Sequence, residues 1–283
     1  MNLSPHTLPV STPQQRHPEH LPGTSILSVK NLSVGYESGR VLENLSFELV
    51  TGERMAVVGP NGAGKSTLFK VIAGLLKPDN GMVSVFGEDP EGHKCISYLP
   101  QRNQVDWNFP VTVSEVVMMG RARRIGLMRW PGKSDREVVA KSIETVGLTP
   151  FSKRQINQLS GGQQQRMFIA RALAQEADLM LMDEPVTGLD TPSQEELFAV
   201  LDLLRTQQVT IMISLHDLKL ASASFDRVML LNHRLIGLGT PAEVFTQENL
   251  SRAYGDRIQF EIEGKEIPFL DDNCCGGEEE HHA

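Results

Sequence analysis

A glycine-rich stretch near residue 60 has the residue types that bind a chain of phosphates. It fits the pattern G-x-x-x-x-G-K-[ST]. Glycines let the backbone curl so that successive N–H groups point at one anion, and the N-terminus of a following helix adds partial positive charge. Lys65 supplies an ammonium group for the β and γ phosphates, and Ser66 supplies a hydroxyl for Mg²⁺. A simple turn before a helix is the alternative, but the apolar strand predicted at Met55–Val58 favours nucleotide binding. The predicted loop consists of Gly59, Pro60, Asn61, Gly62, Ala63, Gly64, Lys65, Ser66 and Thr67.

Two carboxylates follow an apolar run further along the chain. Asp183 and Glu184 come directly after Leu179–Met182. A continuous apolar run is typical of a strand buried on both faces of a parallel sheet, and ligands bind beyond the carboxyl ends of such strands. Asp183 would then face the Mg²⁺ ion of a nucleotide held by Lys65, and Glu184 could accept a proton from an attacking water. A capped strand end before Pro185 is the structural alternative.

A second glycine pair lies in the segment Leu-Ser-Gly-Gly-Gln, residues 159–163. Ser160 is a suitable N-cap for a helix, and Gly161 and Gly162 leave N–H groups unobstructed at the helix start. We expect a second anion site here, with Gln163 as part of the segment. A plain helix cap would explain Ser160, but not two glycines that weaken a helix.

Alternating strands and helices are expected to position these groups. The predicted elements are several strands within 26–58, a helix over 65–76, a strand pair within 81–100, a helical block over 112–174, strands over 179–182 and 210–214, and a helix over about 195–206. The strand–helix–strand rhythm predicts a parallel sheet, and the helical block interrupts it like an inserted subdomain.

The composition is that of an ordinary soluble globular protein and excludes several other classes. Of the 283 residues, 40% are hydrophobic and 22% are charged, and no apolar run reaches the length of about 18 residues that reads as a membrane span. The N-terminus lacks the apolar region of a signal peptide, so we expect a cytosolic protein. The net charge of -8 argues against a general nucleic-acid binder, and three cysteines indicate no disulfide framework.

The chain is predicted to divide into three parts. Residues 1–26 form a disordered arm rich in Pro and His, residues 27–255 form the folded domain with its helical subdomain at about 103–172, and residues 256–283 form a C-terminal extension. That extension ends in an acidic tail containing Cys274, Cys275, His281 and His282. These side chains lack the regular spacing of a zinc site, so a solvated tail is the preferred interpretation. Cys95 is predicted to be a core residue of a strand.

With these motifs the chain resembles the ATP-binding subunits of ABC transporters over about residues 27–250. Five motifs occur in the order of that family: the phosphate loop, Gln101, the segment 159–163, the pair Asp183-Glu184, and His216. The resemblance implies an α/β fold with a P-loop NTPase (RecA-like) core, an antiparallel β subdomain and an inserted α-helical subdomain. It also implies an ATP hydrolase that uses ATP and Mg²⁺.

The resemblance also implies a role for individual residues. Tyr36 matches the aromatic residue that stacks on adenine, although an ordinary strand tyrosine is the alternative. Gln101 matches the glutamine that contacts Mg²⁺ and the attacking water and senses the membrane partner. Glu184 matches the catalytic base, His216 the residue that contacts the γ-phosphate, and Asp190 the loop that crosses the dimer interface. The implied Mg²⁺ ligands are Ser66, Gln101 and Asp183.

In such proteins two subunits enclose two ATP molecules head to tail, so the resemblance implies a homodimer. It further implies a separate integral membrane permease, a peripheral location at the cytoplasmic face of the inner membrane, and no nucleic-acid partner. Residues 101–113 resemble the manganese, zinc and iron importers, which an extracytoplasmic metal-binding protein serves. Within them, Trp107 and Phe109 either dock the permease or pack against the helical subdomain. Importers of siderophores, haem or cobalamin, a soluble ABC ATPase outside transport, and a nucleotide-binding scaffold are the alternatives.

Overall fold

The computed structural model describes residues 23–36, 39–91, 95–101, 105–126 and 129–255. The predictions for the arm up to residue 22, and for the extension from residue 256 with its cysteines and histidines, lie outside the described residues. The first strand begins at Ser25, so Ser25 and Ile26 belong to a sheet. Within the described part of the chain, no helix is both long and apolar enough to cross a membrane.

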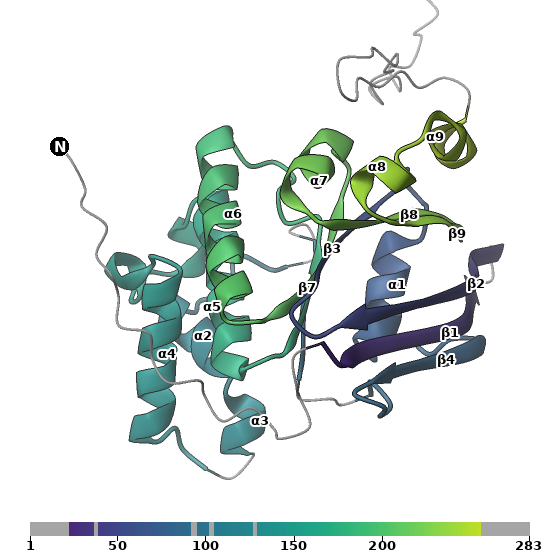
Figure 1. Cartoon of the computed structure of the whole chain (residues 1–283). Helices are drawn as coiled ribbons and strands as arrows, with labels where there is room; N and C mark the ends of the chain where they lie inside the picture. The colour runs from purple at the N-terminus through teal and green to yellow at the C-terminus, as the bar shows by residue number, and fades with distance from the viewer. Residues whose placement is uncertain (1–22, 37–38, 92–94, 102–104, 127–128, 256–283) are drawn as a thin grey trace, which may run out of the picture.

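A six-stranded sheet forms the centre of the molecule (Figure 1). Its strands, in spatial order, are β5 (Ile96–Leu99), β6 (Leu179–Asp183), β7 (Thr210–Leu215), β3 (Arg54–Val58), β8 (Arg227–Asn232) and β9 (Arg234–Gly239). The first five run parallel, and only β9 is antiparallel to its neighbour. The predicted parallel sheet is confirmed, and the fold is the α/β P-loop type.

A smaller antiparallel sheet lies beside the central one. Its order is β2 (Gly39–Val50), β1 (Ser25–Tyr36) and β4 (Asn80–Val85). The prediction of a strand pair within residues 81–100 was wrong, because β4 pairs with β1 while β5 pairs with β6 in the other sheet. Strands that are neighbours in sequence need not pair, and here each of the two pairs with a strand that is distant in sequence.

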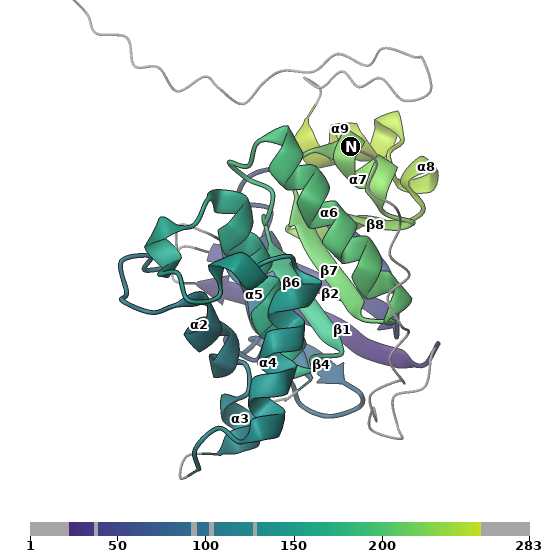
Figure 2. The same cartoon turned by 90° about the vertical axis from the view of Figure 1, so that its left-hand side faces the viewer.

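Helices lie on both faces of the central sheet, and a group of helices packs beside α5, as Figures 1 and 2 show together. The α-helices of the described residues are α1 (Lys65–Ile72), α2 (Val113–Met119), α3 (Ala122–Ile125), α4 (Lys133–Thr145), α5 (Gly161–Gln175), α6 (Thr191–Thr206), α7 (Leu218–Ser224), α8 (Pro241–Val244) and α9 (Gln247–Tyr254). Helix α1 lies between the two sheets, whereas α5 and α6 cover the other face of the central sheet.

Two predicted helices have different ends in the structure. Helix α1 stops at Ile72 instead of residue 76, and a Cβ on Gly74 would come within 2.7 Å of the carbonyl oxygen of Pro90. Helix α6 begins at Thr191 instead of about 195, because Asp190 is its N-cap and Pro192 lies in the first turn. Proline suits that position, since its missing N–H would have no intrahelical acceptor there.

Alternate residues of each central strand enter different hydrophobic cores. Leu181 of β6 and Met212 of β7 pack in the core shared with α1 and the antiparallel sheet. Met182 and Ile213 pack in the core shared with α5, α6 and the other helices. Because side chains alternate along a strand, Asp183 and Ser214 lie on the α1 face. This alternation therefore decides which face of the sheet the site residues at the strand ends occupy.

Candidate active site

Three predicted site motifs converge at the carboxyl edge of the central sheet. Strand β3 ends just before Gly59, β6 ends at Asp183, and β7 ends just before His216. The three strands run parallel as neighbours, with Asp183 opposite Ser214. Segments that are far apart in the sequence therefore meet at one edge, where the topology of an open α/β sheet places ligands.

The phosphate loop is tightly packed against its surroundings. A Cβ on Gly59 would lie 1.9 Å from the carbonyl oxygen of Leu231, so only glycine fits there. Gly64 has a φ of 96° and caps α1, and a Cβ on it would lie 2.4 Å from Leu42. His233 joins the loop to β2, since its N–H donates to Ala63 and its Nδ1 lies 3.0 Å from the carbonyl oxygen of Val41.

Lys65 is buried in the first turn of α1. Its ammonium group donates to the carbonyl oxygens of Gly59, at 2.6 Å, and of Pro60, at 3.1 Å. Burial lowers the pKa of Lys65, and the charges of Glu184 and Asp183 partly oppose that shift. The ammonium group therefore lies near enough to both carboxylates to be affected by their charges. Its hydrogen bonds to Gly59 and Pro60 go to carbonyl oxygens, and a phosphate oxygen can replace these as the acceptor.

Glu184 contacts the other two predicted catalytic residues. Its carboxylate contacts Nε2 of His216 and accepts a hydrogen bond from Gln101. Burial raises the pKa of Glu184, but His216, Lys65 and Gln101 together hold the pKa below its ordinary value. The backbone of Glu184 is left-handed, with a φ of 50°. A non-glycine residue in that conformation indicates local strain, which is common at functional sites.

Asp183 is fully buried and has one free acceptor. Its Oδ1 accepts a hydrogen bond of 2.7 Å from the hydroxyl of Ser214. Its Oδ2 has no hydrogen-bond partner among the described residues. A buried carboxylate oxygen without a partner is unusual, because desolvation then goes uncompensated. Oδ2 of Asp183 and the hydroxyl of Ser66 are both hard oxygen ligands, which is the ligand type that Mg²⁺ prefers.

Tyr36 lies at the end of β1 and is about half exposed, at 49%. It pairs with Gly39 of β2, and Gly39 precedes Val41 by two residues. The segment at Val41 and Leu42 approaches Gly64 of the phosphate loop. Tyr36 thus belongs to a strand pair whose other strand, β2, approaches the loop, and its stacking on a base stays a prediction.

The segment 159–163 begins α5, away from the phosphate loop in sequence and in its contacts. The hydroxyl of Ser160 accepts from the N–H of Gln163 at 3.3 Å, and Oε1 of Gln163 accepts from the N–H of Ser160 at 3.1 Å. This is a capping box. A Cβ on Gly162 would lie 2.8 Å from Ser193 in α6, so close helix packing explains this glycine. Asp190 is exposed at the start of α6.

Comparisons with known proteins show the family to which the chain belongs. The family model of the ABC transporter matches residues 42–187. The manganese transport system ATP-binding protein MntB of Bacillus subtilis is 43% identical over 83% of this chain and 94% of its own length. The chain belongs to the ABC transporter ATP-binding family. It is therefore a nucleotide-binding ATP hydrolase of that family.

Other similar proteins are also named as parts of metal transport systems. The zinc transport system ATP-binding protein TroB of Treponema pallidum is 44% identical over 82% of this chain and 88% of its own length. Among solved structures, a transporter described as of the metal-chelate type, in an inward-facing conformation, is 30% identical and has a TM-score of 0.74. That match covers 87% of this chain and 97% of the other.

The two aromatic residues after Gln101 have different environments in this ABC family member. The ring of Trp107 packs edge-to-face on that of Phe168 in α5, with centroids 5.7 Å apart. Phe109 is 55% exposed. Packing thus accounts for Trp107, whereas Phe109 is available as an apolar anchor for another chain. Residues 102–104 of the same segment lie outside the described residues.

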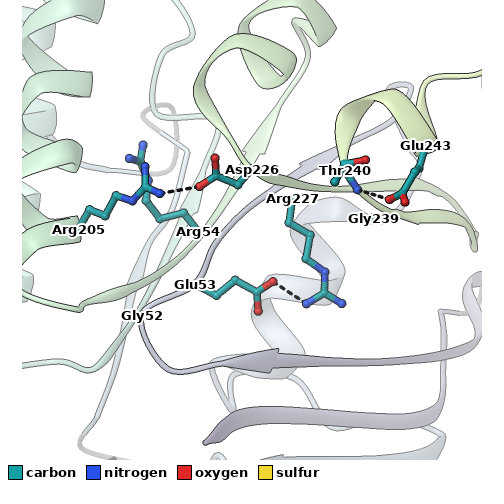
Figure 3. A pocket seen from close by; sticks show the side chains of 9 residues that line it. All are labelled: Gly52, Glu53, Arg54, Arg205, Asp226, Arg227, Gly239, Thr240 and Glu243. Atoms are coloured by element: carbon teal, nitrogen blue, oxygen red, sulfur yellow. Dashed lines mark hydrogen bonds and ion pairs between the residues drawn. The ribbon is translucent and has the colours of Figure 1, made fainter. Parts of the chain in front are cut away.

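A pocket of about 390 Å³ lies at the opposite, amino edge of the central sheet (Figure 3). Its charged side chains neutralise one another, since Arg205 pairs with Asp226 at 2.9 Å and Arg227 with Glu53 at 2.6 Å. No predicted site residue lines it. The phosphate loop, Asp183 and His216 lie instead at the carboxyl edge of the sheet.

Ser214 belongs to none of the predicted motifs. It lies within the apolar run Thr210–Leu215, which predicts a strand, and it contacts the carboxylate of Asp183 and the backbone N–H of Glu184. Its signal in the sequence was a hydroxyl near the end of an otherwise apolar strand. Cys95 also differs from its prediction, because it lies just before β5 and is only half-buried.

Proposed function

We propose that this chain is the ATP-hydrolysing subunit that energises a membrane permease importing divalent metal ions, namely manganese, zinc or iron. One observation carries the proposal: relatives named for manganese and zinc transport are 43–44% identical over nearly their whole length. In this proposal the chain is peripheral at the cytoplasmic face of the membrane, and an extracytoplasmic metal-binding protein delivers the ion to the permease.

The phosphate loop would hold ATP through its backbone N–H groups and through Lys65. The carbonyl oxygens that Lys65 now contacts would yield its ammonium group to the β and γ phosphates. Tyr36 would stack on adenine. Ser66, Asp183 and Gln101 would hold Mg²⁺, and the partnerless Oδ2 of Asp183 supports that assignment. Bound there, Mg²⁺ would neutralise negative charge on the phosphate oxygens.

Glu184 would accept the proton of the water that attacks the γ-phosphate. Its lowered pKa keeps the carboxylate ionised at neutral pH, so it is ready to accept. His216 would hold this carboxylate and face the γ-phosphate, and Gln101 would orient the water. The oxygen of the water would bond to the γ-phosphorus while the bond from that phosphorus to the bridging oxygen breaks, which releases ADP and phosphate, and the proton of the water would pass to Glu184.

The segment 159–163 would act on the nucleotide of a second copy of the chain. In one subunit, Ser160 and Gly162 contact Gln163 and Ser193 rather than the phosphate loop. A head-to-tail homodimer would bring the start of α5 onto the partner's ATP, with Asp190 at the interface. The positive end of the α5 dipole suits a γ-phosphate there.

The permease would contact the surface that carries Phe109. An exposed aromatic side chain on a surface is a typical anchor for a partner. Since Gln101 contacts Glu184 and begins the same segment, a displacement of Phe109 would reach the catalytic carboxylate over a short stretch of chain.

The test measures transport. The chain is expressed with the permease and binding protein encoded beside its gene, in cells lacking their own importers, and uptake of radiolabelled manganese, zinc and iron is compared. We expect uptake of at least one of these ions with the wild type and background uptake with Glu184→Gln. Equal uptake in both would overturn the proposal, and uptake of an iron–siderophore complex instead would favour the chelate importers that the metal-chelate neighbour suggests.

A further inference from the structure

We infer that Ser214 is a positioning residue for ATP hydrolysis: one buried hydroxyl orients the carboxylate of Asp183 toward the metal and holds the backbone of Glu184 in its strained conformation. This inference rests on the proposed roles of those two carboxylates. It adds a residue of β7, outside the motifs that the sequence shows, to the machinery at the ends of β3 and β6.

The hydroxyl of Ser214 makes two hydrogen bonds at once. It donates to Oδ1 of Asp183 at 2.7 Å and accepts from the N–H of Glu184 at 2.8 Å. Ser214 and Asp183 are both fully buried and lie directly opposite each other on neighbouring strands. A buried hydrogen bond to a charged carboxylate is among the stronger ones in a protein. The hydroxyl therefore has little freedom to rotate away.

This hydrogen bond decides which oxygen of Asp183 remains for a metal. With Oδ1 occupied by Ser214, Oδ2 is the free acceptor, and it has no partner among the described residues. Both residues lie on the α1 face of the sheet, where Lys65 and Ser66 form the first turn of the helix. Hydrogen-bonded partners of metal ligands orient them, and their loss commonly costs 10- to 100-fold in metal affinity or activity.

Tyr98 bounds Asp183 from the other side. It lies on β5 opposite Leu181, and its hydroxyl is buried beside the carboxylate. Burial, and then the charge of Asp183, raise the pKa of Tyr98, so the phenol stays protonated beside the carboxylate. Asp183 is thus flanked by two hydroxyls, and the one that makes the 2.7 Å hydrogen bond to its Oδ1 is that of Ser214.

The second contact stabilises an unfavourable backbone. Glu184 has a φ of 50°, a conformation that costs of order 1 kcal/mol or more in a non-glycine residue. Its N–H is held by Ser214 while its side chain contacts His216 from the end of the same strand. Strand β7 therefore supplies a contact to the backbone and a contact to the side chain of the same residue. Without Ser214, the carboxylate of Glu184 would lose its fixed direction.

The experiment uses the purified full-length chain and compares wild type with Ser214→Ala. The expected result is a rise of about 10-fold or more in the Mg²⁺ concentration that half-saturates hydrolysis, with a fall in kcat of about 10-fold. ATP affinity in EDTA should stay within about 2-fold, because the phosphate loop is intact. As a readout that needs no turnover, the affinity for Mn²⁺ in the presence of ADP, followed by electron paramagnetic resonance, should fall to a similar degree.

Thr210→Val is the matched control. Thr210 is a fully buried hydroxyl residue at the other end of β7, where it accepts from the N–H of Gly52 at 2.9 Å. The control should lower thermal stability as Ser214→Ala does, yet keep the Mg²⁺ dependence of the wild type. A folded Ser214→Ala protein with wild-type Mg²⁺ dependence and kcat overturns the inference. So does an equal metal defect in Thr210→Val.

Two further variants decide the matter if Ser214→Ala does not fold. Ser214→Thr keeps the hydroxyl, and Ser214→Cys keeps the size but replaces it by a weak donor. The inference requires the Ser214→Thr variant to bind Mn²⁺ more tightly than the Ser214→Cys variant, and equal affinities of the two variants contradict it. The result stays distinct from the proposed function: absence of ATP hydrolysis in the wild type, with its permease present, would remove the function. An active wild type that Ser214→Ala matches would remove only this inference.

Discussion

His216 contacts Glu184 across two neighbouring parallel strands. Nε2 of the imidazole meets Oε1 of the carboxylate, although 32 positions separate the two residues in the sequence. The contact places the proposed base against the residue proposed to face the γ-phosphate. Because the two side chains touch, a change at His216 alters the pKa of Glu184 and the orientation of its carboxylate.

Glu184→Gln should leave ATP binding intact and slow hydrolysis by about 100-fold or more, because an amide cannot accept the proton of water. Phosphate release checks the rate, and equilibrium ATP binding checks the affinity. The variant should also elute as a dimer in size-exclusion chromatography with ATP. Undiminished phosphate release would refute the role of Glu184 as base.

His216→Ala should raise the pKa of Glu184. Burial, which raises this pKa, remains in the variant, while the hydrogen bond and charge of His216, which lower it, are removed. A carboxylate is ionised above its pKa, so a higher pKa moves its loss of charge to higher pH. The residual hydrolysis of the variant should therefore fall off on the acid side at a higher pH than that of the wild type. An acid limb at the same pH would contradict the coupling.

Lys65→Ala should weaken ATP binding by about 100-fold or more, because a buried cation facing the phosphates is lost. Equilibrium binding of a fluorescent ATP analogue measures the effect. The control is Lys77→Ala, since Lys77 is exposed and forms an ion pair with Glu91 at 3.0 Å. Unchanged affinity in Lys65→Ala would refute the assignment of the phosphate loop.

Gly162→Ala should destabilise the protein by about 1–3 kcal/mol, because its Cβ would lie 2.8 Å from Ser193. The same substitution in a Ser193→Gly background should be neutral or stabilising, since alanine favours a helix over glycine by about 1 kcal/mol. Thermal unfolding of the four proteins measures both effects. The same sign in both backgrounds would show that the contact with Ser193 is not the cause.

Cys95 should react slowly with thiol reagents in the folded protein. Burial, and then the charge of Asp178, raise the pKa of its thiol to about 12 from 9.0. Only the thiolate reacts, and a raised pKa keeps the thiol protonated until strongly alkaline pH, so at pH 8 the rate should be about 1000-fold below that of the unfolded chain. A Cys274→Ser, Cys275→Ser background isolates the signal. Equal rates with and without denaturant would contradict the shift.

The sequence predicted some parts of the fold well because their signals are local. The apolar run Leu179–Met182 and the glycine pattern before Lys65 each identify an element within a few residues. The strand pair predicted within residues 81–100 failed, since periodicity shows that a strand exists but not with which strand it pairs. The start of α6 was missed because apolar periodicity begins later than the cap at Asp190.

The sequence by itself determined the family and the chemical types at the site. Its motifs contain a phosphate-binding loop, an acidic pair and a histidine at recognisable spacings. Only the tertiary structure decided that the hydroxyl of Ser214 lies between Asp183 and Glu184, that Gly162 packs on Ser193, and that Phe109 rather than Trp107 is exposed. The physical reason is that these contacts depend on strand register and helix packing between distant segments, and a linear pattern contains neither.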